Sequence, residues 1–163
     1  HYKMSDQALF DQYFKFSFVR NPWERILSVY KYLIHGGNQI SNSDLYYKNV
    51  FEKDYNTFDK FVLNFLNSDR LHEYLLFKPQ FPFICDHRYN LQVDFLGKFE
   101  NIENDMNHVA QKIGFNYFQL PKNNTSPFIN RDTYYRSQSV INKVYDLYAK
   151  DIELFQYKFP FNN

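Results

Sequence analysis

Hydrophobic and polar residues alternate most regularly between Phe14 and Gly37, where the pattern predicts a strand, a turn and a helix. In 14–19, phenylalanines at every second position alternate with Lys15, Ser17 and Val19, which is the period of a β-strand. Asn21 suits the N-cap and Pro22 the first position of the helix that follows. Its apolar face comprises Ile26, Leu27, Tyr30, Leu33 and Ile34. Gly36 or Gly37 can supply the left-handed residue that ends the helix.

The rest of the chain predicts further helices and one more clear strand. Helices are expected at 5–10, 57–67, 101–113 and 137–157, the last as one helix or as two with a bend, and a mostly apolar strand at 93–99. The polar and aromatic stretch 38–55 predicts a loop with irregular or briefly helical structure. A short hairpin or tight turn is expected around Asp86 to Arg88.

Composition narrows the class of protein. The chain has 163 residues, enough for one domain with a single core, and its net charge of +1 gives no strong field for nucleic acid or an acidic membrane. No segment is apolar enough for a membrane helix, and no signal peptide is visible. The single cysteine, Cys85, excludes an internal disulfide.

Arg20 and Ser28 form the strongest candidate for a binding site. Arg20 follows the first predicted strand, and open α/β sheets place their ligands at the carboxyl ends of strands. A guanidinium binds phosphate oxygens through two N–H groups, and a serine hydroxyl adds a neutral donor. An alternative stays open, in which Arg20 pairs with Glu24 and Ser28 binds nothing.

Two short stretches resemble metal sites and are set aside. His72 and Glu73 have no second histidine at the spacing that a metalloprotease helix requires. Cys85, Asp86 and His87 are too close in sequence to surround a zinc ion, and no partner pair of ligands exists. We therefore expect no metal.

Three stretches together resemble one known family. The segment FVRNPWERILSVY, from Phe18 to Tyr30, contains every fixed position of the pattern V-R-[ND]-P-x-x-R-x-x-S-x-Y. The stretches VDFLGKFENIENDM at 93–106 and VYDLYAKDIELFQYKF at 144–159 resemble further segments of the same family. The chain resembles the sulfotransferases that use PAPS (3′-phosphoadenosine 5′-phosphosulfate), in the carbohydrate sulfotransferase branch.

The resemblance implies a fold, a donor and residue roles. The fold is α/β, with a P-loop-like parallel sheet flanked by helices and more helix than strand. Arg20 and Ser28 would bind the 3′-phosphate of PAPS, the cofactor that donates the sulfuryl group. His1 would be the catalytic base, although a frayed terminal histidine is an equal alternative. Arg131 and Arg136 are weaker candidates for nucleotide contacts, and Lys78 and Gln80 for acceptor contacts.

We therefore expect an enzyme that transfers a sulfuryl group from PAPS to a hydroxyl or amine, with a carbohydrate as the expected acceptor. The family's phosphosulfate-binding loop is not found in 1–163, so we expect a single domain truncated at its N-terminus. Such a fragment would bind PAPS weakly and turn over little, and it could be inactive. The alternative is a non-catalytic module that binds a glycan or a protein partner. A nucleic-acid-binding domain is disfavoured by the charge.

Localisation is expected to be cytoplasmic, as in bacterial members of the family. The Golgi lumen is the alternative for a eukaryotic fragment. The sequons at Asn123 and Asn124 would be meaningful only in a secreted protein.

Overall fold

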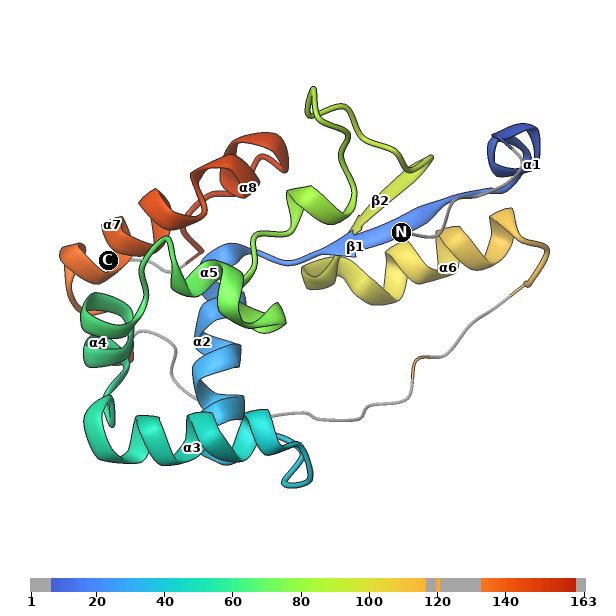
Figure 1. Cartoon of the computed structure of the whole chain (residues 1–163). Coiled ribbons are helices and arrows are strands. Elements are labelled where there is room, and N and C mark those ends of the chain that lie inside the picture. The colour runs from blue at the N-terminus through green and yellow to red at the C-terminus, as the bar shows by residue number, and fades with distance from the viewer. Residues whose placement is uncertain (1–6, 117–119, 121–132, 161–163) are drawn as a thin grey trace. The chain divides into compact units, whose positions relative to one another are not determined.

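The computed structural model describes residues 7–116, 120 and 133–160 (Figure 1). The chain packs as two units, each made of two separate stretches. Unit 1 comprises 1–20 and 81–125, and unit 2 comprises 21–80 and 126–163. The expectation of a single domain remains a prediction.

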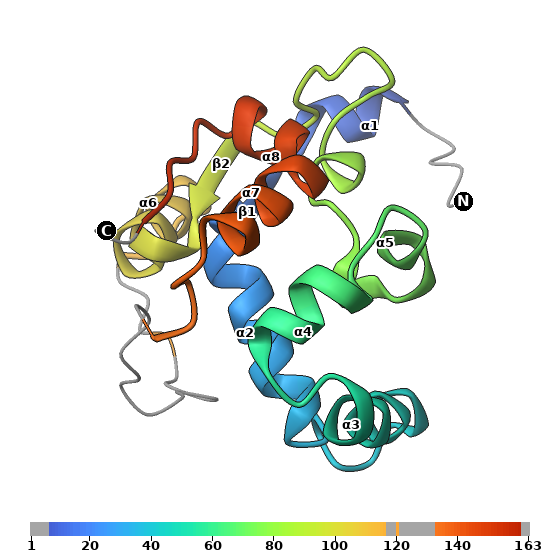
Figure 2. The same cartoon turned by 90° about the vertical axis from the view of Figure 1, so that its left-hand side faces the viewer.

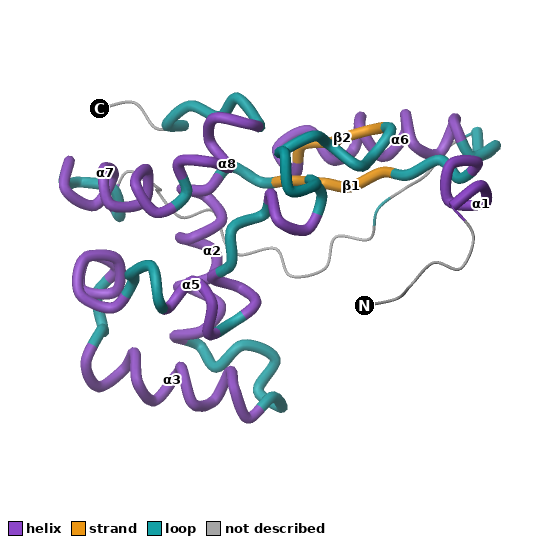
Figure 3. The backbone as a smooth tube through the Cα atoms, turned by 45° about the horizontal axis from the view of Figure 1, so that its top comes forward, coloured by secondary structure: helices purple, strands orange, loops and turns teal. Residues whose placement is uncertain are grey.

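Unit 1 contains the sheet. Its regular elements are α1 (Gln7–Gln12), β1 (Phe16–Val19), β2 (Phe95–Lys98) and α6 (Ile102–Lys112), with 3₁₀ turns at Phe81–Phe83 and Phe99–Asn101. The two strands are parallel and lie side by side (Figure 3), and α6 packs against β2. The predicted class, a helix-rich α/β fold with a parallel sheet, is confirmed, and the sheet has two strands in the described part of the chain.

Local contacts fix the register of this sheet. Gly97 is the partner of Phe18, and a Cβ added at Gly97 would lie only 2.4 Å from the Phe18 ring, so no larger residue fits there without rearrangement. At the other end, Lys15 Nζ lies 2.9 Å from Asp94 Oδ2, and the Lys15 amide donates to the same oxygen at 2.8 Å. A slip in register would therefore lose both the ion pair and the close packing on the glycine.

Unit 2 is helical, and Figure 2 shows its elements from the side. They are α2 (Pro22–Ile34), α3 (Asn42–Asp54), α4 (Phe58–Lys60), α5 (Arg70–Glu73), α7 (Gln138–Leu147) and α8 (Ala149–Leu154), with a π-helical segment at Phe61–Phe65 and a 3₁₀ turn at Leu75–Phe77. Of the two alternatives for the last helical segment, the structure shows two helices, because α7 and α8 are separated at Tyr148.

Both ends of α2 agree with the prediction. The Asn21 side chain accepts a hydrogen bond from the Trp23 amide at 3.1 Å, as an N-cap does, and Pro22 is the first helical residue. At the other end, the amides of Gly36 and Gly37 bond to carbonyls of the last turn at 2.9 and 2.8 Å. This is a Schellman arrangement, and both glycines have positive φ.

The prediction for 38–55, a loop followed by irregular or briefly helical structure, underestimated the helix, because the 13 residues of α3 occupy most of the segment. This helix buries only a narrow stripe formed by Asp44, Tyr47 and Phe51. A buried aspartate in that stripe interrupts the apolar period by which an amphipathic helix is recognised.

Aromatic side chains form most of the core of unit 2. Rings that pack there include Tyr30, Tyr47, Phe51, Phe58, Phe61, Phe65, Phe77 and Tyr135. Trp23 connects α2 to the C-terminal helices, because its indole Nε1 donates to the Ile141 carbonyl at 3.1 Å. None of the described helices has the length and apolar composition needed to cross a membrane.

Candidate functional site

Arg20 and Phe99 meet at the carboxyl end of the sheet. The register pairs Val19 with Lys98, so the residues that follow them are neighbours. The guanidinium carbon of Arg20 lies 4.6 Å from the centroid of the Phe99 ring. Stacking uses the face of a guanidinium, and its in-plane N–H groups can then form hydrogen bonds with an anion.

Asp105 on α6 fixes the turn that carries Phe99. Its Oδ2 accepts the Lys98 amide at 2.7 Å, and its Oδ1 accepts the Asn101 side-chain amide at 2.8 Å. The end of β2, the 3₁₀ turn and α6 are therefore held together by one carboxylate. Sequence reasoning assigned no role to Phe99 or Asp105 individually, although the Phe-Glu-Asn motif marked this turn.

Ser28 lies in unit 2, half-buried on α2. It lines a pocket of about 370 Å³ together with Val29, Tyr32, Asn38, Ser41, Asp44, Tyr74 and Leu76. A serine hydroxyl that lines a pocket could contribute a hydrogen bond to a ligand.

Asp44 supplies a buried carboxylate to the lining of this pocket. It accepts hydrogen bonds from the Tyr32 hydroxyl at 2.8 Å, the Asn38 amide at 3.2 Å and the Tyr74 hydroxyl. Burial alone would raise the pKa of Asp44, but the three donors together hold the pKa below its usual value. Asp44 is therefore ionised at neutral pH, with its charge directed at groups of the protein itself.

The structure places the site residues predicted from sequence in different parts of the molecule. Arg20 belongs to unit 1 and Ser28 to unit 2, so their joint contact with one anion stays a prediction. His1, Arg131 and both sequons lie outside the described residues. Arg136 lines a second pocket of unit 2.

Arg25, another fixed position of the sequence pattern, lies in the interior of unit 2. Burial lowers its pKa, while the nearby Tyr148 and Asp151 raise it. Asp151 is fully buried and accepts the Gln80 backbone amide at 2.7 Å and its side-chain amide at 3.4 Å. The hydrogen bonds of Gln80 connect the segment after α5 to α8, and a contact of Gln80 or Lys78 with an acceptor stays a prediction.

No group of three or more histidine, cysteine, aspartate or glutamate side chains that could hold a metal ion occurs within the described ranges.

Comparisons with known proteins identify the family. The model for the Sulfotransferase family matches residues 1–158. An uncharacterized protein of Archaeoglobus fulgidus is 37% identical over 109 residues, which cover 66% of this chain and 73% of that protein. Carbohydrate sulfotransferase 14 of Danio rerio is 25% identical over 174 residues, covering 91% of this chain but only 45% of the relative. No solved structure matches.

The family match, together with a helix-rich α/β fold, defines the class as that of the sulfotransferases. The chain belongs to the sulfotransferase family, and the prediction made from its motifs is confirmed at that level.

Proposed function

We propose that the protein transfers a sulfuryl group from PAPS to a hydroxyl or amine, with a carbohydrate as the acceptor. The observation that carries the proposal is the placement of Arg20 beside Phe99 at the carboxyl end of the parallel sheet. Membership of the sulfotransferase family supports the reaction class. The carbohydrate acceptor is proposed by analogy with the Danio rerio relative, which is named as a carbohydrate sulfotransferase.

In this proposal Arg20 and Ser28 bind the 3′-phosphate of the donor. Phe99 restrains the guanidinium from one face, so less side-chain entropy is lost when the phosphate binds. Asp105 does not contact the phosphate in this proposal, but it fixes the turn that carries Phe99.

The transfer is a displacement at sulfur. The acceptor oxygen or nitrogen forms a bond to sulfur, and the bond from sulfur to the bridging phosphate oxygen breaks. The products are the sulfated acceptor and 3′-phosphoadenosine 5′-phosphate. The acceptor loses one proton, for which we propose His1 as the base, because a neutral imidazole accepts a proton near physiological pH.

Binding of 3′-phosphoadenosine 5′-phosphate, measured by isothermal titration calorimetry, tests the donor site. Arg20→Ala should weaken binding by about 30-fold or more, since a charge-assisted hydrogen bond contributes about 1.5–3 kcal/mol. Ser28→Ala removes a neutral donor and should weaken binding by about 5-fold. Phe99→Leu keeps the apolar volume but removes the ring and should weaken binding by about 3-fold.

Arg88→Ala is the matched control. Arg88 is an exposed arginine of the same unit, in the tight turn that Asp86 caps through the Arg88 amide at 2.8 Å. Its loss should leave nucleotide affinity unchanged. If Arg20→Ala binds the nucleotide as tightly as Arg88→Ala, the donor site is not at the end of β1 and the proposal fails.

A further inference from the structure

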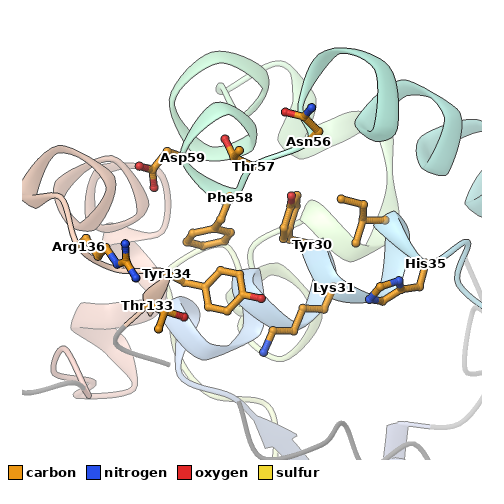
Figure 4. A pocket seen from close by; sticks show the side chains of 11 residues that line it. Tyr30, Lys31, His35, Asn56, Thr57, Phe58, Asp59, Thr133, Tyr134 and Arg136 are labelled. Carbon is orange, nitrogen blue, oxygen red and sulfur yellow. The ribbon is translucent and has the colours of Figure 1, made fainter. Parts of the chain in front are cut away.

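A second pocket lies in unit 2 on another side of α2. It has a volume of about 530 Å³ and is lined by Tyr30, Lys31, Ile34, His35, Asn56, Thr57, Phe58, Asp59, Thr133, Tyr134 and Arg136 (Figure 4). Ser28 and Tyr32 line the other pocket, and helical spacing places them away from Tyr30 and Ile34. The two pockets are therefore separate sites on one helix.

The charge of this pocket is predominantly positive. Lys31 on α2 and Arg136 before α7 are permanent cations, and His35 lies at the end of α2. Asp59 contributes the one carboxylate in the lining. The excess of positive charge in the lining favours binding of an anionic ligand.

Arg136 is the group best placed to bind that anion. Its side chain is exposed, and it makes no hydrogen bond or ion pair with any residue that the structure describes. Figure 4 shows it beside Phe58 and Tyr134, at the edge of the cavity. An arginine in this state can bind a carboxylate or a sulfate through two parallel hydrogen bonds without first breaking another contact.

Aromatic rings and small polar groups make up the rest of the lining. Tyr134 packs edge-on against Phe58 with ring centroids 5.7 Å apart, and Lys31 Nζ lies 4.8 Å from the Tyr134 ring. Burial, with a smaller contribution from Tyr134, raises the pKa of Tyr30 to about 12, so its hydroxyl stays protonated as a donor. Asn56 and Thr57 lie across the pocket from Lys31 (Figure 4).

We propose that this pocket binds a sugar acid or a sugar sulfate, with Arg136 on the anionic group and the ring against Tyr134. The apolar face of a pyranose ring packs on an aromatic ring, and its hydroxyls match short polar side chains such as Asn56 and Thr57. The volume lies within the range of about 300–1,000 Å³ typical of small-molecule sites and is too large for an inorganic anion alone. This binding is independent of the proposed donor site.

Three monosaccharides that differ in one group test the proposal: glucuronate, glucose 6-sulfate and glucose. Binding is followed by the chemical shifts of backbone amides in the full chain. At least one anionic sugar should bind with a Kd of about 1 mM and shift the amides of 56–59 and 133–136, and glucose should bind about 10-fold more weakly. The anionic sugar with the lower Kd shows whether the pocket prefers a carboxylate or a sulfate.

Substitutions locate the contact. Arg136→Ala should weaken binding of the anionic sugar by about 10-fold, and Tyr134→Leu by about 5-fold. Lys53→Ala removes an exposed cation of α3 in the same unit, outside the pocket, and should change affinity by less than about 2-fold.

Several outcomes would overturn the proposal. If glucose binds as tightly as both anionic sugars, the pocket does not recognise an anion. If Arg136→Ala and Lys53→Ala bind the anionic sugar with equal affinity, Arg136 does not contact it. Displacement of the sugar by 3′-phosphoadenosine 5′-phosphate, with nucleotide binding lost in Arg136→Ala, would assign the pocket to the donor. None of these results depends on whether Arg20→Ala impairs nucleotide binding, so the two proposals fail separately.

Discussion

Both pockets on α2 contain tyrosines, short polar side chains and one aspartate, yet their charged groups differ and are arranged differently. Around Asp44, hydroxyls of Tyr32 and Tyr74 and a backbone amide surround one buried carboxylate. In the other pocket, the Arg136 guanidinium lies at an open cavity without such partners in the described residues. A polar cluster whose members satisfy one another stabilises the fold, whereas a charge at an open cavity is available to a ligand. Substitutions should therefore affect stability at one pocket and binding at the other.

Asp44→Ala should give the largest effect on stability. It leaves two tyrosine hydroxyls and one amide without their acceptor, and we expect the free energy of unfolding to fall by about 3 kcal/mol. Urea denaturation followed by far-UV circular dichroism measures this. Asp54→Ala, an exposed aspartate at the end of α3, is the control and should stay within about 0.5 kcal/mol of the parent. A loss below about 1 kcal/mol for Asp44→Ala would mean that the carboxylate is not a structural centre.

Gly37→Ala should give the next largest loss, about 2 kcal/mol, because two effects combine. Gly37 has a φ of +59°, and an added Cβ would lie 2.2 Å from Asp44 Oδ2. Gly114→Ala is a matched control, since Gly114 has a φ of +92° but no atom of the described residues lies within 4 Å of the added Cβ. Its cost should be about 1 kcal/mol, from the backbone alone. Equal losses in thermal unfolding would contradict a tight contact between Gly37 and Asp44.

Low pH should reduce the contribution of the Asp44 carboxylate to the free energy of unfolding. The folded-state pKa of Asp44 is lowered, so its contribution is fully present above the unfolded pKa of about 3.9 and is lost as pH falls through the folded value. The unfolding free energy of the parent should therefore fall below about pH 5 more steeply than that of Asp44→Asn, which cannot ionise. Parallel pH profiles for the two proteins would show that this carboxylate has no depressed pKa.

Arg136→Ala should give the smallest change in stability, within about 0.5 kcal/mol, because the side chain is exposed and bonds to nothing in the described structure. Chemical denaturation of this variant beside Asp44→Ala tests the comparison directly. A loss above about 1 kcal/mol would show that Arg136 stabilises the fold.

Local chemistry made much of the fold predictable from sequence. Asn21 and Pro22 mark the start of α2 because capping and fixed φ act within a few residues, and Gly36 and Gly37 mark its end for the same reason. The strand at 93–99 was found as a run of apolar residues, although β2 is shorter. These signals do not depend on what lies across the molecule.

Tertiary contacts explain what was missed. The segment 38–55 was predicted to be irregular because the partners of Asp44 come from 32, 38 and 74, and no local period reveals them. The stacking of Phe99 on Arg20 depends on a strand register between residues about 80 positions apart. The motif indicated that Arg20 and Ser28 could bind an anion, but not what surrounds either side chain.

The interleaved stretches of the two units have a consequence for biosynthesis. The sheet can pair once residue 98 has left the ribosome, but the partners of Trp23 come later, at Ile141 and Phe159. At about 5–20 residues per second, the apolar face of α2, complete at Ile34, waits about 6–25 s for its partners up to Phe159. During that interval it is a surface that a chaperone would bind. Because Trp23 is the single tryptophan, its fluorescence reports the arrival of those helices and therefore the completion of the fold.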